Sequence, residues 1–207
     1  VTVTVKAEEG RNYLAGSTSF TVKVNKAAGK ITASDITRNY SAKKQYVNTG
    51  WQSNGGGKLT YSSDNKAVKI DAKGKITIAK KFTGLATITV KASETNDYKA
   101  GSCKVAVTVK PSKTSITRVV NGAKKKATVT WKKNKTGTGY VIQYSTDKRF
   151  RKGVKTLYIS KNKTTKATLS KLSKGKKYYV RIATYKAAGK NKICSSWSKV
   201  KRIKIRK

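Results

Sequence analysis

The sequence contains no histidine, one proline and two cysteines among its 207 residues. Without histidine, the chain lacks the usual general base and every Ser-His or Cys-His pair of nucleophilic catalysis. The commonest zinc ligand is missing for the same reason, and two distant cysteines do not fill a tetrahedral metal site. We therefore expect no catalytic residue, no metal site and no cofactor.

Acidic residues are also scarce. The chain has eight, most of them in predicted turns: Glu8, Glu9, Asp35, Asp64, Asp71, Glu94, Asp97 and Asp147. They show neither the spacing of a calcium-binding loop nor two carboxylates placed to face each other across a cleft, as glycoside hydrolysis requires. The sequence therefore predicts a protein that is not an enzyme.

Long apolar runs and a sustained helical period are absent as well. No stretch reaches the roughly 18 consecutive apolar residues of a transmembrane helix, so we expect no membrane insertion. No signal peptide precedes the first strand-like residues, which start at once with Val-Thr-Val-Thr-Val. We therefore expect the sequence to be a fragment or a mature segment of a longer protein.

Positive charge is what the sequence has in excess. Lysine and arginine number 49 against eight acids, which gives a net charge of +41. Most of these side chains must lie on solvent-exposed faces and in loops, because charged residues are rarely buried without a partner. The charge attracts polyanions such as wall teichoic acids, acidic glycans, anionic lipid surfaces and nucleic acid. A solvated lysine surface without any particular partner explains the same composition, and both interpretations stay open.

Nucleic-acid binding follows from this charge only in a non-specific and salt-sensitive form. Specific readers usually carry a recognition helix or an aromatic-bearing sheet motif, and the sequence shows neither pattern. We therefore expect no specific nucleic-acid partner.

Alternating apolar and polar residues mark short strands between residues 59 and 92. The inward positions are Leu59 and Tyr61, then Val68 and Ile70, then Ile76 and Ile78, then Ile88 and Val90. A period of two indicates strands with one buried and one solvated face. Gly74 and Gly84 stand in the turns between them, where left-handed backbone angles are common. Tyr61 is therefore a core candidate.

This stretch resembles the bacterial immunoglobulin-like repeat of the group 2 type, found in surface proteins of the intimin and invasin class. The resemblance rests on the aromatic strand with Ser-Ser-Asp (61–64), the apolar pair at 68 and 70, Gly-x-Ile-Thr (74–77) and Gly-x-Ala-Thr-Ile-Thr-Val (84–90). It covers about one domain and implies a small β-sandwich. It implies no ligand, because the repeat is most often a spacer.

An internal repeat links residues 1–24 to residues 86–109. The two segments align without a gap at an offset of 85, with 12 identities in 24 positions. A fixed period of this length indicates tandem domains. We therefore expect residues 1–27 to be the last strand pair of a truncated immunoglobulin-like repeat. A lone hairpin is marginal in water, so we expect it to lean on the start of the next domain.

The complete repeat is predicted to span residues 28–110. We expect a first strand or bulged edge over 31–36 and another strand over 40–49, with Tyr46 in the core. The glycine-rich loop 50–58 lacks the Gly-Lys-Ser/Thr of a phosphate loop and is not a nucleotide site. Trp51 in this loop is either a core or edge tryptophan or an exposed stacking residue for a partner. Tyr40 is a second exposed-aromatic candidate.

The only proline, Pro111, marks the boundary to a second unit that spans residues 111–207. Strands are expected over 127–131, 139–145, 154–160, 165–170, 178–182 and 200–205. Trp131, Tyr140 and Tyr144 on these strands, together with the spacing from Leu172 to Tyr178, resemble a fibronectin type III domain of the lysine-rich kind found on Firmicutes surface proteins. The resemblance implies a tyrosine corner at Tyr178.

The resemblance departs from the family at Lys174, where proline is common, so a looser corner is expected. The structural core assigned to the whole chain from these patterns comprises Tyr61, Trp131, Tyr144, Leu172 and Tyr178.

Ser196-Trp197-Ser198 resembles half of the tryptophan–serine box of cytokine receptors, in which basic residues of a neighbouring strand stack on the indole. Arg181 has outward parity on its strand, so a cation–π contact between Arg181 and Trp197 is one interpretation. Simple packing of Trp197 at the sheet edge is the other. Neither interpretation is catalytic.

The two cysteines are predicted to be buried free thiols. Cys103 shares parity with the inward residues Val105 and Val107, and Cys194 lies in the other unit. A bridge between them would require the two units to fold back on each other.

The sequence as a whole predicts an all-β protein of tandem antiparallel β-sandwiches in an elongated arrangement, monomeric in isolation. We expect a non-catalytic stalk or adhesion segment of a bacterial surface protein, extracellular, whose lysine surface favours an anionic glycan or wall polymer. One alternative is a dedicated binding module for a host protein, such as an immunoglobulin, or a host glycan. Another is an accessory part of a large wall-associated enzyme. The candidate partner-binding residues are Trp51, Tyr40, Arg181 and Trp197.

Overall fold

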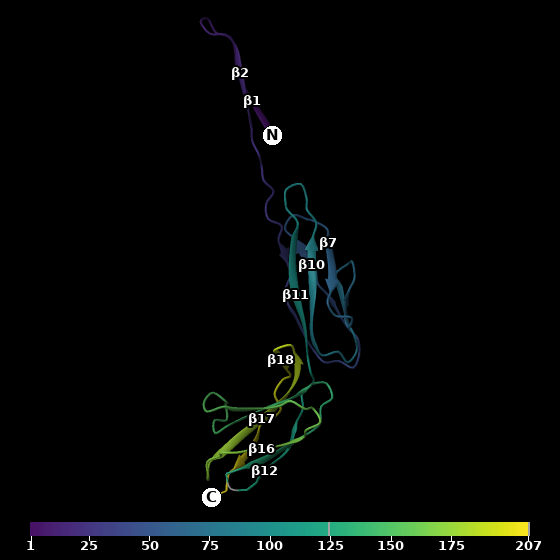
Figure 1. Cartoon of the computed structure of the whole chain (residues 1–207), viewed down its shortest axis with the longest axis vertical. Coiled ribbons are helices and arrows are strands. Elements are labelled where there is room, and N and C mark those ends of the chain that lie inside the picture. The colour runs from purple at the N-terminus through teal and green to yellow at the C-terminus, as the bar shows by residue number, and fades with distance from the viewer. Residues whose placement is uncertain (124, 207) are drawn as a thin grey trace.

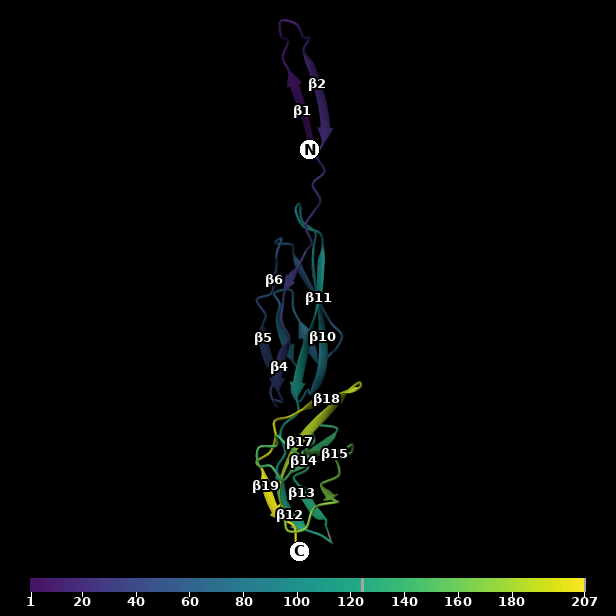
Figure 2. The same cartoon turned by 90° about the vertical axis from the view of Figure 1, so that its left-hand side faces the viewer.

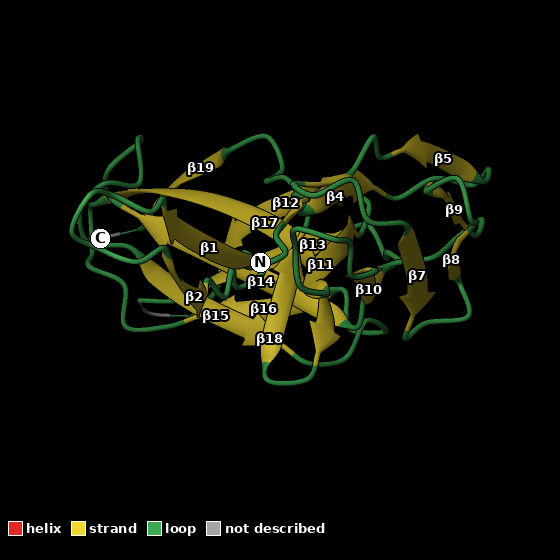
Figure 3. Ribbon diagram, turned by 90° about the horizontal axis from the view of Figure 1, so that it is seen from above, coloured by secondary structure: helices red, strands yellow, loops and turns green. Residues whose placement is uncertain are grey.

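The computed structural model describes residues 1–123 and 125–206. All its regular elements are strands, and the described residues contain no helix, as the all-yellow elements of Figure 3 show. Consequently, no described helix is long and apolar enough to cross a membrane. The elements form an isolated hairpin, a central domain and a C-terminal domain, which follow one another along a single long axis (Figures 1 and 2). The expected all-β, elongated architecture is confirmed.

The N-terminal hairpin consists of β1 (Thr2–Ala7) and β2 (Gly16–Thr21). It has the register of the hairpin formed by β10 (Gly84–Ala92) and β11 (Gly101–Lys110) in the central domain. Val3 lies opposite Phe20 in the first, and Ile88 lies opposite Val105 in the second, again at an offset of 85. The repeat in the sequence is therefore also a repeat of strand pairing.

The two hairpins differ in burial. Phe20 is 53% exposed, whereas its counterpart Val105 is 1% exposed within the core of the central domain. The hairpin does not lean on that domain as expected, since all residues of β1 and β2 are exposed. The contacts come from the following linker: Lys26 pairs with Glu94, and Ala27 forms a bridge with Tyr98. The hairpin thus stays the isolated strand pair that is marginal in water.

The central domain is a sandwich of a four-stranded sheet, β4-β11-β10-β7, and a three-stranded sheet, β5-β9-β8, with a small pair β3-β6 beside them. Its remaining strands are β3 (Ile31–Thr32), β4 (Ile36–Asn39), β5 (Gln45–Asn48), β6 (Gln52–Ser53), β7 (Leu59–Ser63), β8 (Val68–Ile70) and β9 (Lys75–Ile78). The inward residues predicted from alternation form its core, with Val68, Ile76, Ile78, Ile88 and Val90 fully buried. Tyr61 packs against this core, and Cys103 does so from β11.

The prediction of Tyr46 as a core residue is wrong. Tyr46 is 57% exposed, and Lys75 places its ammonium 5.0 Å from the centre of the ring. On β5 the neighbouring Val47 packs against the core instead. Because side chains alternate across a strand, a shift of one residue turns the tyrosine to solvent.

The C-terminal domain packs a three-stranded sheet, β12-β13-β16, against a larger sheet in the order β15-β14-β17-β18, with β19 also paired to β17. Its strands are β12 (Ile116–Asn121), β13 (Ala127–Trp131), β14 (Gly139–Ser145), β15 (Lys155–Ile159), β16 (Lys166–Leu169), β17 (Lys177–Ala188), β18 (Asn191–Cys194) and β19 (Lys201–Lys204). Strand β17 is longer than the predicted 178–182 because its second half pairs with β18.

The core of this domain contains three buried aromatic residues, Trp131, Tyr140 and Tyr178. Trp131 is 2% exposed and packs edge-on against Tyr140, with the ring centres 5.4 Å apart. The hydroxyl of Tyr178 accepts a hydrogen bond of 3.1 Å from the backbone N–H of Ser173, which is the bond of a tyrosine corner. Leu172 is 1% exposed, and Tyr144 packs against the same core. The corner therefore forms with lysine at position 174.

Candidate functional site

A stack of one cation and two aromatic rings lies on the outer face of the larger C-terminal sheet. The guanidinium of Arg181 lies 4.2 Å from the ring centre of Phe150 and 4.4 Å from that of Trp197. The side-chain oxygen of Gln143 on the neighbouring strand accepts hydrogen bonds from its Nε and Nη2 atoms, at 3.0 and 2.6 Å. The cation–π interpretation of Arg181 and Trp197 is thus confirmed.

The loop after β14 positions Phe150 on this stack. The carboxylate of Asp147 accepts hydrogen bonds from the backbone N–H groups of Arg149 and Arg151, at 2.8 and 2.7 Å. These amide donors stabilise the charged form, so the pKa of Asp147 is lowered from its ordinary value. Burial lowers the pKa of Arg181, but a guanidinium stays protonated throughout the physiological range. The stack therefore carries a fixed positive charge.

A second cation lies among aromatic rings further along the same face. The ammonium of Lys192 on β18 lies 5.1 Å from the ring centre of Tyr158 and 5.8 Å from that of Tyr185. The two tyrosine rings meet edge to face at 6.1 Å. Tyr158 is 56% exposed, whereas Tyr185 is 4% exposed, and its pKa is raised mainly by burial.

Strand register places both groups on one surface. Arg181 lies opposite Gln143, and Tyr185 follows Arg181 by four residues on β17, so both side chains point outward. At about 3.3 Å per residue, the two positions are about 13 Å apart along the strand. We name this surface the aromatic–basic face; its members are Gln143, Phe150, Tyr158, Arg181, Tyr185, Lys192 and Trp197.

The other two predicted partner-binding residues lie elsewhere. Trp51 packs against the core of the central domain, 6.2 Å from the ring of Tyr61, beside a shallow depression of about 370 Å³. Tyr40 lies at the junction of the two domains, where it lines a hollow of about 310 Å³ together with Pro111 and Ser196. The structure therefore brings together Arg181 and Trp197 and places Trp51 and Tyr40 apart from them.

A network of hydrogen bonds holds the junction between the central and C-terminal domains. Asn134 is 8% exposed, and its side-chain amide donates to the backbone and side-chain oxygens of Ser112 at 2.9 and 3.0 Å. Its side-chain oxygen accepts from the backbone N–H of Thr136 at 2.8 Å. The hydroxyl of Thr83 in the central domain then donates to the backbone oxygen of Thr136 at 2.8 Å. The linker is thus clamped to both domains.

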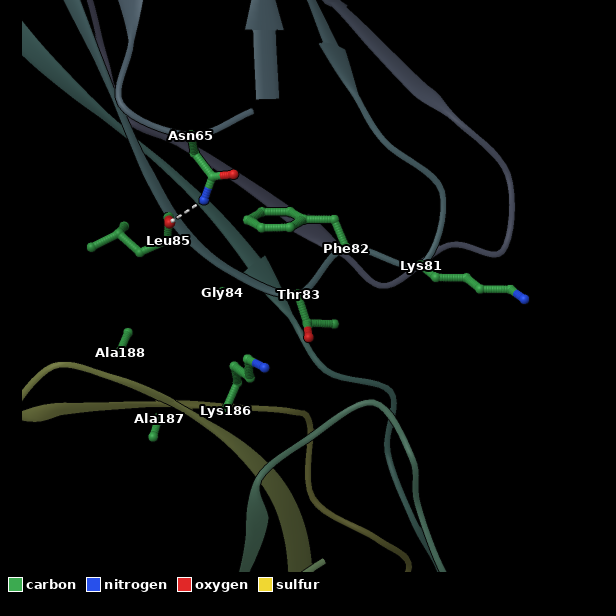
Figure 4. Close-up of a pocket in the computed structure, with 9 residues that line it drawn as sticks. All are labelled: Asn65, Lys81, Phe82, Thr83, Gly84, Leu85, Lys186, Ala187 and Ala188. Atoms are coloured by element: carbon green, nitrogen blue, oxygen red, sulfur yellow. Dashed lines mark hydrogen bonds between the residues drawn. The ribbon is translucent and has the colours of Figure 1, made fainter. Parts of the chain in front are cut away.

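A groove of about 450 Å³ lies beside this clamp (Figure 4). One wall comes from the loop after β7, the loop before β10 and the start of β10, and the other from the end of β17. The lining residues are Asn65, Lys81, Phe82, Thr83, Gly84, Leu85, Lys186, Ala187 and Ala188. The lining contains two lysines and no acid, and Lys186 points toward Thr83 across the groove (Figure 4).

Within residues 1–123 and 125–206, no three His, Cys, Asp or Glu side chains cluster as metal ligands would. Cys103 and Cys194 are both unpaired and half-buried, and burial raises the pKa of each thiol. The free thiols agree with the sequence prediction, although neither is fully buried.

Sequence reasoning missed part of the aromatic–basic face. The pair Tyr158 and Tyr185 carried a usable signal, because each has outward parity on its strand. Phe150 carried none, since it lies in a loop with a positive φ of 56° and its position depends on the turn around Asp147. Lys192 was also missed, because β18 was not predicted.

The fibronectin type III family model matches residues 109–200 of the chain. Among solved structures, the FN1–FN3 domains of chicken CNTN1 align with a TM-score of 0.44 and 14% identity, covering 98% of this chain and 76% of that one. The fn3 domain of human contactin 1 aligns with a TM-score of 0.39 and 20% identity, covering 47% and 80%. A titin segment aligns with a TM-score of 0.37 and 12% identity, covering 100% and 75%. No curated protein matches the chain.

The second sandwich accordingly matches the fibronectin type III model over most of its length, and modules of this class are commonly non-catalytic stalks or binding units. The family match covers the second sandwich, whereas the strands and sheets described above define the tandem all-β fold of the whole chain.

Proposed function

We propose that the chain is a non-catalytic stalk and adhesion segment of a larger bacterial cell-surface protein, exposed outside the cell. Its lysine-rich surface attracts anionic partners, and its elongated, clamped domains hold that surface away from the rest of the protein. The uncompensated positive charge of the C-terminal domain is the observation that carries this proposal.

The charge has almost no internal partner. Among the described residues, the one ion pair is Lys26 with Glu94, and it lies at the far end of the central domain. Residues 111–206 contain a single acid, Asp147, and its carboxylate is bonded to amides of its own loop. A field of one sign over a whole domain draws in polyanions and raises their association rate.

The clamped junction supports the stalk. Thr83 bonds across the domain boundary, and Asn134 fixes the linker around Ser112. A linker whose backbone is bonded in this way differs from a flexible Gly-Ser linker, which behaves as a random coil. The two domains therefore extend end to end, as in Figures 1 and 2.

Binding to surfaces coated with dextran sulfate or poly-glutamate tests the proposal. At about 0.05 M NaCl, where the Debye length is about 14 Å, we expect binding that weakens steadily as salt rises. Protein whose lysines have been acetylated, and whose fold is verified by circular dichroism, is the control and should bind much less. Absence of binding to both polymers at the low salt concentration would contradict the proposal.

A further inference from the structure

The aromatic–basic face holds two cations without a carboxylate partner. Within the described residues, neither Arg181 nor Lys192 takes part in a salt bridge. Gln143 occupies Nε and Nη2 of the arginine, and two rings cover its faces, so Nη1 remains as a donor. The ammonium of Lys192 has three N–H donors. Among the described aromatic rings, it lies over those of Tyr158 and Tyr185. Both groups are positioned before any ligand arrives.

The sheet between the two cations carries no charge, and its residues Ala183 and Val141 are almost fully buried. Ala183 lies between Arg181 and Tyr185 on the outward side of β17, and its partner across the sheet is Val141. Positions 181 and 185 are about 13 Å apart along β17, and the ammonium of Lys192 lies 5.8 Å from the ring centre of Tyr185. The two cations are therefore spaced along the strand in a way that suits an extended polymer with separated anionic groups. A small anion would contact only one of the two.

The rings distinguish between polymers. Single-stranded nucleic acid binds by stacking its bases on open aromatic faces. Here each of the four rings already has one of the protein's own cations over one face, at 4.2 to 5.8 Å from the ring centre, and that face is not open to a base. The amide of Gln143 and the hydroxyl of Tyr158 add neutral polar groups of the kind that sugar hydroxyls bond.

From this arrangement we infer that the aromatic–basic face binds a linear acidic polysaccharide, whose carboxylate or sulfate groups are held by Arg181 and Lys192. The inference rests on the proposed function. It narrows the general attraction of the chain for polyanions to binding of acidic polysaccharides at the aromatic–basic face. Each cation forms a charge-assisted hydrogen bond with an anionic group of the polymer.

The experiment measures the binding of four polymers to the intact chain. Hyaluronan tests carboxylate groups and dextran sulfate tests sulfate groups. Poly-glutamate is a polyanion without sugar, and single-stranded DNA is a polyanion with bases. Binding is measured at about 0.5 M NaCl, where the Debye length is about 4 Å and diffuse attraction is screened. We expect at least one polysaccharide to remain bound while poly-glutamate and DNA are released.

Two matched double variants locate the site. Arg181→Gln with Lys192→Gln removes the two cations of the face, and Arg118→Gln with Lys166→Gln removes the same charge from the opposite sheet. The two control residues are exposed and flank Thr130 on β12 and β16. We expect the first variant to weaken polysaccharide binding at least about tenfold, as for a lost charge-assisted hydrogen bond, and the second to leave it nearly unchanged.

Loss of binding can be distinguished from loss of the fold. Lys192 is exposed, so the single variant Lys192→Gln keeps the fold and should by itself weaken binding, while melting curves check the Arg181 change. Equal losses in the two double variants, or binding that disappears for every polymer at about 0.5 M, would overturn this site and leave the proposed function intact. Retention of DNA alone at that salt would overturn the polysaccharide assignment. Absence of binding at low salt as well would overturn both proposals.

Discussion

At the scale of single residues, Tyr178 shows how one hydroxyl closes the C-terminal domain. Its ring lies in the core at 6% exposure, and its hydroxyl accepts the N–H of Ser173. Tyr178→Phe keeps the ring and removes this bond, so we expect a loss of about 1 kcal/mol in the free energy of unfolding. Urea denaturation measures it, with Tyr158→Phe as the control, because Tyr158 is exposed and should change little. Equal stability of the two variants would show that the corner bond contributes nothing.

Asp147 links residue chemistry to pH. Its pKa is lowered from the ordinary 3.8, chiefly by the amide of Arg149 and then by that of Arg151. A carboxyl with a lower pKa in the folded chain stabilises the fold above its unfolded pKa and loses that contribution as pH falls through the folded value. We therefore expect loop 146–153 to remain ordered at neutral pH and to loosen only below about 3.8.

Amide exchange and chemical shifts of this loop, followed by NMR during acidification, measure the transition. Asp147→Asn is the comparison: it removes the negative charge, so its loop should already be looser at neutral pH and should not respond to acid in this range. A loop in the unmodified protein that loosens near neutral pH would contradict the assignment of this transition to Asp147.

At the scale of elements, the N-terminal hairpin is a strand pair without its sandwich. It has the register of β10 and β11, yet Val3, Val5 and Phe20 are exposed where their counterparts are buried. Deleting residues 1–24 therefore removes no core contact, and we expect the melting transitions of the two domains to be unchanged. Differential scanning calorimetry checks this, with a longer deletion of residues 1–27 as the comparison.

The longer deletion also removes the exposed Lys26–Glu94 pair, which is worth about 0–1 kcal/mol, so the central domain should soften only slightly. Loss of a cooperative transition on removal of residues 1–24 would show that the hairpin belongs to one of the cores.

Among the elements, the longer strands are the ones that the sequence predicts well. Long alternating strands were found because period two identifies them, and most residues expected to point inward are buried. The two-residue strand β6 was not found, since two residues show no period. The strand or bulged edge expected over 31–36 is divided between β3 and the start of β4. Tyr46 was misplaced because its strand spans only four residues, so that a shift of one residue reverses the faces.

In the candidate site, some residues were predicted from the sequence and others were not. Arg181 and Trp197 were paired from strand parity and a local motif, and the structure places them in contact. Phe150 and Asn134 lie in loops, where position depends on hydrogen bonds to distant residues and not on a repeating pattern. Sequence therefore identifies the strand-borne half of the surface and leaves the loop-borne half to the structure.

At the scale of the whole molecule, the two joints between bodies differ in construction. The first depends on an exposed ion pair, with side chains 38% and 55% exposed, and on one strand bridge. The second contains the buried side-chain amide of Asn134. The backbone N–H of the same residue donates to the hydroxyl of the fully buried Tyr140 at 2.7 Å. Buried and satisfied bonds hold a geometry that exposed pairs do not. We therefore expect a flexible joint after the hairpin and a stiff one between the domains.

Thr83→Val tests the stiff joint without disturbing either core. Valine keeps the shape of the side chain and removes the hydrogen bond to the backbone oxygen of Thr136, which bonds the central domain directly to the C-terminal one. One such bond is worth about 1 kcal/mol, or about a fivefold shift in the ratio of clamped to open junctions. We expect a wider spread of interdomain angles in residual dipolar couplings and a shorter mean length in small-angle X-ray scattering, with both melting temperatures unchanged.

Thr87→Val on β10 is the matched control, because Thr87 is equally half-buried but lies within the strand. If both variants give the distribution of the unmodified chain, the stiffness resides in the Asn134 network alone, and the bond across the boundary does not determine the shape of the stalk.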